Sequence, residues 1–229
     1  MIDINKFDYF IFDCDGVILD SNKLKSRAFA ETLTNDPSQI VAEFVEYHKK
    51  NGGISRYEKF RYYFEEMKKS TSSKKDMEKA LNSFASIVKN GLLECNYISG
   101  VLEFINRANK NKQSMFIVSG SDENELKDVF SQRGISHLFE KVYGSPSSKL
   151  ENTRKVKKVI GANKKGIFFG DSKSDFIAAT KYDLHFVFVR GVSEWVDGDR
   201  LNIKKGNMVI DDFTDIKLKN TRRVKDITN

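Results

Sequence analysis

The chain has 229 residues, of which 39% are hydrophobic, so it can bury a core as one large domain or as a main domain with a smaller one. Only 2 prolines, 14 glycines and 2 cysteines are present, which excludes collagen-like chains and disulfide-stabilised secreted scaffolds. The formal net charge is +7, but the basic residues lie along the whole chain and are interleaved with 32 acidic residues. We therefore expect no nucleic-acid partner, and we interpret the basic cluster in residues 217–225 as solvated surface.

No apolar stretch reaches the roughly 20 residues that span a bilayer. The N-terminus lacks the basic and then apolar layout of a signal peptide. We therefore expect a cytoplasmic protein without a membrane partner. The sequence does not indicate an oligomeric state.

The first element is a short apolar run, residues 9–12, which is typical of a buried parallel strand. It stops at Asp13-Cys14-Asp15-Gly16, so two carboxylates follow the carboxyl end of a strand. Residues two apart on an extended segment point the same way, which lets both carboxylates face one ligand.

Residues 21–91 lack strand patterns and repeat apolar residues at helical spacing, for example at Val41, Phe44 and Val45. Ser55 and Glu58 have the spacing of a capping box, which predicts a helix beginning at Arg56. The polar residues 70–75 predict a connecting loop. We predict a helical domain over 21–91, inserted into a core domain made of residues 1–20 and 92–229.

Three further apolar runs follow, at residues 115–118, 166–169 and 185–189, with helical patterns before the first two. This alternation predicts an α/β fold: a Rossmann-like parallel sheet with helices on both faces. Ligands of such sheets bind beyond the carboxyl ends of the strands. Asp13, Ser119 and Asp171 all fall there, so we expect them to converge.

These residue types suit attack on a phosphate ester, which needs a nucleophile, an acid for the leaving alkoxide, and cations. Asp13 and Asp15 offer the first two. Asp171 can complete the oxygen shell of a magnesium ion, and Ser119 with the amides that follow it, from Gly120 on, provides an anion site. Lys149 supplies positive charge, although Lys141 and Lys155 are alternatives by position alone.

An Asp-x-Asp pair by itself is more often a turn than a site. Four motifs in order, however, resemble those of the haloacid dehalogenase-like hydrolase superfamily. They are Asp13-Cys14-Asp15-Gly16-Val17, then Ser119, then Lys149, then Gly170-Asp171-Ser172-Lys173-Ser174-Asp175. The resemblance covers essentially the whole chain, and within the family it is similar to members like phosphoglycolate phosphatase and β-phosphoglucomutase.

That resemblance implies that Asp13 forms an aspartyl-phosphate and that Asp15 protonates the leaving alcohol and then activates water. Ser119 and Lys149 would hold the phosphoryl oxygens. Mg²⁺ would be bound by Asp13, the backbone carbonyl of Asp15, and Asp171, with Asp175 shaping its surroundings. The helical insert resembles the family's C1-type cap, which closes over the site.

Three residues near the insert are candidates for substrate contacts. Asn22 either contacts the substrate or caps the helix that follows it. Arg56 and Lys59 open a cap helix and either bind an anionic group or form a solvated helix end, and we favour binding for Arg56. Cys14 and the histidines, among them His48, are assigned no chemistry.

The function expected is a magnesium-dependent phosphatase for a small phosphomonoester: a sugar, polyol or amino-alcohol phosphate, with surface-polysaccharide biosynthesis as a setting that a weaker resemblance suggests. The alternative is a phosphosugar mutase, which would retain phosphate in an isomerised sugar. A binding module without turnover is the third hypothesis, against which the acid Asp15 argues.

Overall fold

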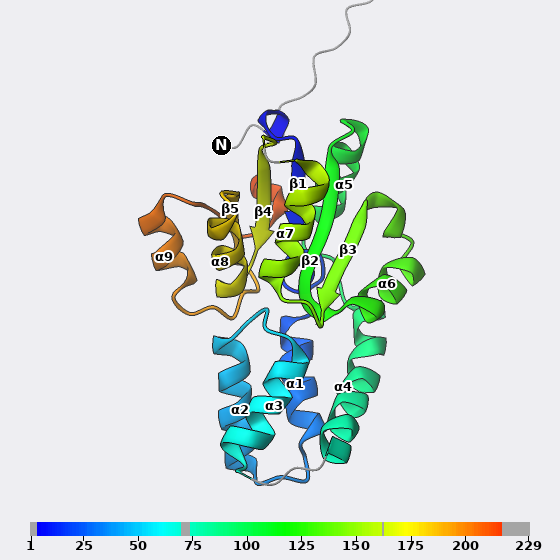
Figure 1. The fold of residues 1–229 in the computed structure, drawn as a ribbon, viewed down its shortest axis with the longest axis vertical. Helices are drawn as coiled ribbons and strands as arrows, with labels where there is room; N and C mark the ends of the chain where they lie inside the picture. The colour runs from blue at the N-terminus through cyan, green and yellow to red at the C-terminus, as the bar shows by residue number, and fades with distance from the viewer. Residues whose placement is uncertain (1–3, 70–73, 162, 217–229) are drawn as a thin grey trace, which may run out of the picture.

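The computed structural model describes residues 4–69, 74–161 and 163–216. Its upper part in Figure 1 is a six-stranded sheet in the order β3-β2-β1-β4-β5-β6, in which every neighbouring pair is parallel. The strands are β1 (Tyr9–Phe12), β2 (Ser114–Asp122), β3 (Lys141–Ser145), β4 (Gly166–Gly170), β5 (His185–Val189) and β6 (Met208–Ile210). The predicted α/β fold is confirmed.

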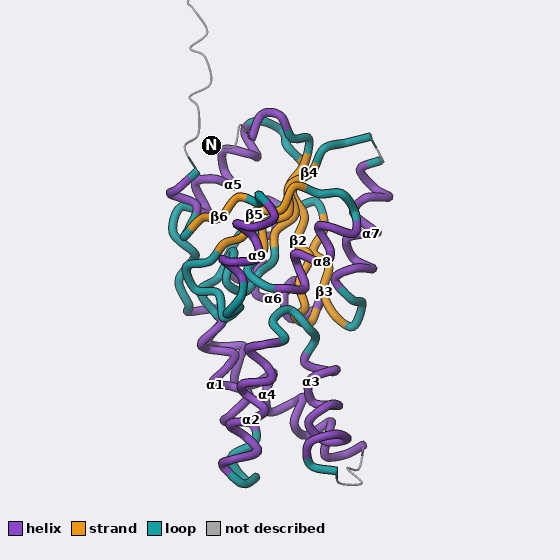
Figure 2. Tube along the Cα trace, turned by 90° about the vertical axis from the view of Figure 1, so that its left-hand side faces the viewer, coloured by secondary structure: helices purple, strands orange, loops and turns teal. Residues whose placement is uncertain are grey.

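Helices cover both faces of the sheet, as the turned view in Figure 2 shows. Alternate residues of a strand point to opposite faces. Phe10 and Phe12 belong to the core that includes the apolar residues of α5 and α6, whereas Tyr9 and Ile11 belong to the one with α7 and α8. These helices are α5 (Val101–Lys110), α6 (Glu123–Gln132), α7 (Lys149–Ile160), α8 (Lys173–Lys181) and α9 (Gly198–Lys205).

Two strands, β3 and β6, had no counterpart in the sequence prediction. They are the edge strands of the described sheet, and β3 begins at an exposed lysine while β6 has only three residues. An edge strand is only partly covered, so its sequence needs no continuous apolar run. This is why both escaped a search for such runs.

Four helices form a bundle below the sheet in Figure 1: α1 (Asn22–Thr32), α2 (Ser38–Lys50), α3 (Arg56–Tyr62) and α4 (Lys74–Glu94). We call this bundle the cap. Its centre is aromatic: the Phe29 ring lies 5.5 Å from Phe44, 5.3 Å from Phe60 and 4.2 Å from Phe84, measured between ring centroids. Residue 91, where we predicted the cap to end, lies inside α4.

Helix α3 begins at Arg56 as predicted, and the Ser55 hydroxyl accepts a hydrogen bond from the Glu58 amide at 3.3 Å. A π-helical turn, Tyr63–Met67, follows it directly. Of the predicted loop, residues 70–73 lie outside the described part, and residues 74 and 75 already belong to α4. The basic cluster at 217–225 also lies outside it.

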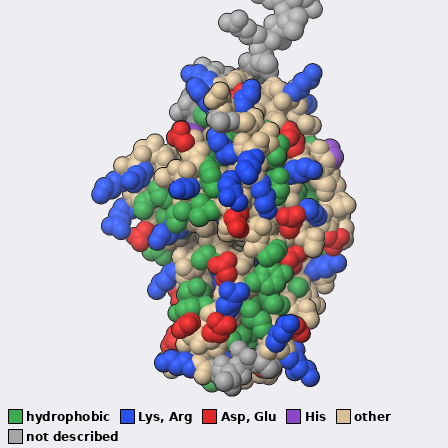
Figure 3. Space-filling view, viewed as in Figure 1, with side chains coloured by type: hydrophobic (Ala, Val, Ile, Leu, Met, Phe, Trp, Pro, Cys, Tyr) green, Lys and Arg blue, Asp and Glu red, His purple; other side chains and the backbone are tan. Residues whose placement is uncertain are grey.

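Basic and acidic side chains lie interspersed over both parts of the molecule on the face in Figure 3. Among the described residues, no helix is both long enough and apolar enough to cross a bilayer.

Candidate active site

The predicted residues meet at the carboxyl edge of the sheet, where it faces the cap. Strand β1 lies between β2 and β4, and all three run the same way, so Asp13, Ser119 and Asp171 arrive side by side. All three are buried. A cavity of about 700 Å³, including open space at its mouth, lies between these residues and the cap, and its walls include Asp13, Asp15, Ser119, Asp171, His48 and Lys59.

Asp13 and Lys149 form a buried ion pair at this edge. The Lys149 Nζ atom donates to Asp13 Oδ2 at 2.6 Å and to Asp175 Oδ1 at 2.5 Å, and the Cys14 amide donates to Asp13 Oδ1 at 2.7 Å. Burial would lower the pKa of Lys149, but the two carboxylates outweigh it and raise that pKa. Lys149 is therefore charged, and it meets Asp13 from α7 as the sequence predicted.

Three carboxylates crowd beside this lysine. One oxygen each of Asp13, Asp171 and Asp175 lies within 4.8 Å of the others. Burial raises the pKa of Asp13 to about 7; the neighbouring carboxylates add to this shift and Lys149 opposes it. Burial and the charge of Asp13 raise the pKa of Asp171 well above its usual value. The negative charge is thus only partly offset, and hard oxygen ligands in this number suit a divalent cation such as Mg²⁺.

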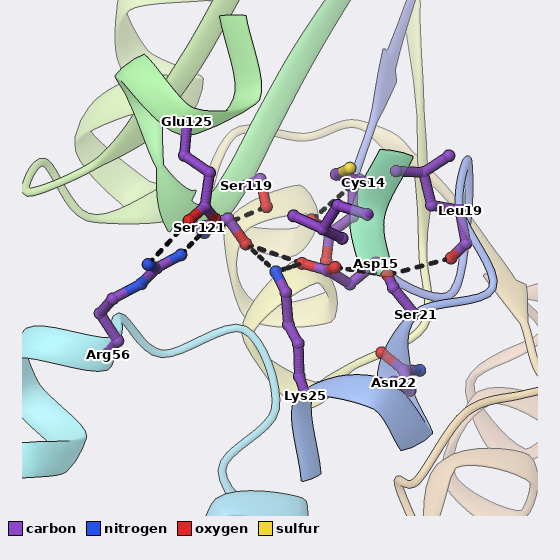
Figure 4. A network of polar contacts seen from close by, with 12 residues as sticks. Cys14, Asp15, Leu19, Ser21, Asn22, Lys25, Arg56, Ser119, Ser121 and Glu125 are labelled. Atoms are coloured by element: carbon purple, nitrogen blue, oxygen red, sulfur yellow. Dashed lines mark hydrogen bonds and ion pairs between the residues drawn. The ribbon is translucent and has the colours of Figure 1, made fainter. Parts of the chain in front are cut away.

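Asp15 lies outside this acidic cluster and has its own partners, shown in Figure 4. Its Oδ2 atom accepts from Lys25 Nζ at 2.5 Å and from Ser121 Oγ at 2.7 Å, and its Oδ1 atom accepts from Ser21 Oγ at 2.5 Å. Burial would raise the pKa of Asp15, but Lys25 and the hydroxyls outweigh it and lower the pKa to about 2. Asp15 is therefore an ionised carboxylate in this arrangement.

Sequence reasoning missed Lys25 and Ser121. Lys25 lies one turn into α1, and its ammonium reaches back to bond both Asp15 and the Ser121 hydroxyl. Ser121 is two residues beyond Ser119 on β2, so period-two alternation was the signal that would have placed it on the same face. For Lys25 the only signal was its helical spacing from the predicted site residue Asn22.

Asn22 holds Asp171 in place. Its Nδ2 atom donates to Asp171 Oδ2 at 2.6 Å and to the Val192 carbonyl at 3.0 Å. The N-cap position of α1 belongs to Ser21, so the helix-capping alternative for Asn22 is wrong. Asn22 lines the cavity, and contact with substrate stays a prediction.

Arg56 lies at the cavity wall but already has a partner. Its guanidinium donates two hydrogen bonds to the carboxylate of Glu125 on α6, the Nη1 bond being 2.9 Å long (Figure 4). Next to it, the Tyr57 hydroxyl donates to Asp122 at 2.8 Å. These contacts join the cap to the core, and a substrate contact of Arg56 stays a prediction.

Cys14 is fully buried, and burial together with the nearby charge of Asp15 raises its thiol pKa well above the usual value. A thiol with such a pKa stays protonated and is a poor nucleophile. We therefore still expect Cys14 to take no part in the chemistry.

The cap loop touches the core through two glycines, Gly53 and Gly120. A Cβ atom at Gly120 would lie 2.2 Å from the Gly53 carbonyl oxygen, and Gly53 has a φ of +74°. The two backbone segments can approach this closely because both positions are glycine. The approach brings the loop into contact with Lys149 and Ser174.

We expect Gly120→Ala to lower kcat/KM by about 10- to 100-fold, because the methyl group forces the cap loop away from the site and misplaces the bound substrate. Steady-state kinetics would measure it, with KM rising more than kcat falls. The control is Gly134→Ala, where a Cβ meets nothing within 4 Å but the φ of +71° strains an alanine, so this variant should lose stability and keep its kinetics. Unchanged kinetics in Gly120→Ala would show that the loop contact plays no part in turnover.

A family model described as haloacid dehalogenase-like hydrolase matches residues 10–189. No curated protein matches the chain in sequence. Similar solved structures include a predicted phosphoglycolate phosphatase from Haemophilus somnus (TM-score 0.73, 16% identity, covering 92% of this chain and 96% of that one).

Two further similar structures carry sugar-phosphate names or ligands. One is β-phosphoglucomutase from Clostridium difficile (TM-score 0.69, 23% identity, 92% and 93% coverage). The other is CbbY from Rhodobacter sphaeroides in complex with xylulose-(1,5)bisphosphate (TM-score 0.69, 12% identity, 93% and 97% coverage). At these identities the likeness shows the shared fold. Since the family model spans most of the sequence and all four motifs lie within that match, the chain belongs to the haloacid dehalogenase-like hydrolases.

Proposed function

We propose that this protein is a magnesium-dependent phosphatase that hydrolyses a small phosphomonoester through an aspartyl-phosphate at Asp13. The observation that carries the proposal is the geometry of Asp13: a buried carboxylate at the cavity, held by Lys149 at 2.6 Å, with a second carboxylate, Asp15, two residues away. A substrate phosphoryl group entering the cavity would meet both.

In the first half-reaction an oxygen of Asp13 attacks phosphorus, and the bond from phosphorus to the leaving alcohol breaks. Lys149 keeps Asp13 oriented and lowers the pKa of that carboxyl against the effect of burial, since its ammonium lies beside it. The Ser119 side chain and the Gly120 amide, on the same wall of the cavity, bind the phosphoryl oxygens. The departing alkoxide takes a proton from Asp15.

Asp15 has to carry that proton first, because Lys25 and the hydroxyls hold it ionised. The proton comes with the substrate, as the hydrogen on the phosphoryl group of a phosphomonoester monoanion, while Lys25 Nζ stays hydrogen-bonded to Asp15 Oδ2 at 2.5 Å. In the second half-reaction the ionised Asp15 accepts a proton from water, which attacks phosphorus and releases Asp13 and inorganic phosphate.

The residues suited to Mg²⁺ are Asp13 and Asp171, together with the backbone carbonyl of Asp15, while Asp175 is held by Lys149 and Ser172. When bound, the cation offsets the charge of carboxylates and phosphate as they approach each other. Asn22 orients Asp171 for this role through its 2.6 Å hydrogen bond.

The second candidate is a phosphosugar mutase, favoured by the shared fold with β-phosphoglucomutase. It would use the same Asp13 and Asp15, but would return the phosphoryl group to the sugar. We infer that the enzyme is cytoplasmic and acts on a phosphorylated sugar, polyol or amino alcohol. We also propose that the chain forms two domains, a core of residues 1–20 and 92–229 and a cap of residues 21–91.

Phosphate release from a panel of phosphomonoesters tests the function. We expect release with Mg²⁺, a fall to background when a chelator removes the metal, and recovery when Mg²⁺ is added back in excess. Phosphate that stays in an isomerised sugar would identify the mutase. If no ester releases or transfers phosphate with Mg²⁺ present, the proposal fails.

A further inference from the structure

Among the described residues, a buried lysine in the cap lacks the carboxylate partner that the other buried cations around the cavity have. Lys59, on α3, is 3% exposed, and within the described part of the chain its ammonium has one hydrogen bond, 2.7 Å to Nδ1 of His48 on α2. By contrast, Lys25 pairs with Asp15, Arg56 with Glu125, and Lys149 with Asp13 and Asp175.

The contact with Lys59 determines the tautomer of His48. An ammonium can only donate, so Nδ1 of the neutral ring accepts and the ring proton lies on Nε2. That Nε2 atom is buried and has no hydrogen-bond partner among the described residues; the nearest carboxylate oxygen, Glu194 Oε2, is 3.9 Å away. When Lys59 is protonated, His48 therefore presents an unused N–H donor, and the Lys59 ammonium presents two.

The surroundings of Lys59 leave its charge poorly compensated. Its ammonium lies 5.6 Å from the centroid of the Phe29 ring, and burial, followed by the nearby charge of Lys25, lowers its pKa to about 7 despite Asp15 and Glu194. A buried cation without a counter-ion is costly, and an anion beside it removes that cost.

Lys59 and His48 line the same cavity as Asp13 and Asp15. A substrate whose phosphoryl group lies at Asp13 would therefore extend its leaving alcohol from the core towards the cap, past the Phe29 and Phe84 rings. Arg56, which the sequence favoured for this contact, has its donors directed at Glu125.

We propose that Lys59 and His48 form a cap subsite for an anionic group on the leaving alcohol, so that the substrate is a phosphomonoester carrying a second oxyanion, a carboxylate or a phosphate. This inference rests on the proposed phosphatase function and narrows its substrate class. Phosphate esters of neutral sugars and of amino alcohols, which lack this second oxyanion, should therefore be poor substrates.

Four esters with the same three-carbon chain test the subsite: phosphooxypropanoate, propanediol bisphosphate, propanediol monophosphate and aminopropyl phosphate. Each is assayed with Mg²⁺ for phosphate release, and as a competitive inhibitor of hydrolysis of an aryl phosphate. We expect kcat/KM, or the affinity as inhibitor, to be about 10- to 100-fold higher for the two anionic ends than for the neutral end. The ratio between the first two esters distinguishes carboxylate from phosphate.

In Lys59→Met the preference for the anionic ends should fall to nearly one, with KM rather than kcat carrying the change in that ratio. The control is Lys79→Met, an exposed lysine on the cap helix α4, which should keep the preference. His48→Phe should weaken it partly, because Lys59 remains.

Three results would overturn the subsite while leaving the phosphatase proposal intact. The wild type could show equal kcat/KM for the four esters, it could prefer the ammonium ester, or Lys59→Met could keep the preference for the anionic esters. An inactive enzyme on every ester, the aryl phosphate included, would instead overturn the proposed function and the inference with it.

Discussion

Asp13→Asn is expected to abolish phosphate release, with a loss on the order of 10⁴-fold or more, since removing a covalent nucleophile removes the intermediate through which both half-reactions pass. The amide is nearly the same size as the carboxylate, and its oxygen can still accept from the Cys14 amide. The loss would therefore report chemistry. It is measured as phosphate release under single-turnover conditions with Mg²⁺.

The stability of Asp13→Asn separates chemistry from folding. Burial raises the pKa of Asp13 to about 7 from 3.8, so the protonated form is favoured in the folded state. The stability that this shift contributes is complete below pH 3.8 and is lost as the pH rises through about 7. In metal-free buffer, the variant should therefore gain stability relative to the wild type as the pH rises from 4 towards 8, measured by urea unfolding.

A matched control for this variant is Asp20→Asn. Asp20 is an exposed aspartate seven residues further along, and it should keep full activity when changed. Substantial turnover in Asp13→Asn, with Asp20→Asn unchanged, would contradict the aspartyl-phosphate mechanism.

Lys149→Met is expected to cost both activity and stability. Lys149 Nζ is the one cation that the structure's described part places within hydrogen-bond distance of Asp13 and Asp175. Its loss leaves buried carboxylates without their partner, which destabilises a protein by about 3–5 kcal/mol. Activity should fall by roughly 10²–10³-fold as the phosphoryl group loses a cation.

The stability loss in Lys149→Met has a predictable pH dependence. Without the ammonium, the folded-state pKa values of the crowded carboxylates rise further, since Lys149 lowers those of Asp13 and Asp171 in the wild type. The deficit is therefore smallest near pH 4 and grows as the pH rises through about 7. Added Mg²⁺ should reduce it, which urea unfolding with and without the metal would measure.

The control for this variant is Lys155→Met on the same helix. Lys155 donates to Ser147 and Asn152 and has no ion pair with a carboxylate in the described residues, so its loss should leave activity within about 2-fold of the wild type. Equal losses in the two variants would mean that Lys149 has no special role. This pair also tests the choice of Lys149 over Lys155 that sequence context made.

The elements that the sequence predicted well are those whose residues are dictated locally. The buried strands β1, β2, β4 and β5 are apolar because both faces are covered, and α3 begins where Ser55 can cap it. The edge strands β3 and β6 are only partly covered and need no continuous apolar run, so the sequence search missed them. Helix was predicted for the region of α4, but the predicted end of the cap at residue 91 lies inside this helix, which packs against α1 and α6.

The site divides in the same way. Sequence reasoning proposed Asp13, Asp15, Ser119, Lys149 and Asp171 because each belongs to a motif at the end of an apolar run or after a turn-forming loop. Ser119 lies inside β2, which continues to Asp122. Lys25 and Ser121 carry no motif, and they matter because α1 and β2 bring them to within hydrogen-bond distance of Asp15.

What the sequence determined by itself was the parallel sheet, the order of its four motifs, and therefore the rim at which the acidic residues converge. Only the tertiary structure decided the partner of each charge. Arg56 is paired with Glu125, whereas Lys59 is buried against His48 with no carboxylate partner in the part of the chain that the structure describes. The physical reason is that a side chain's pKa and its free donors depend on groups distant in sequence, which packing of the cap on the core brings together.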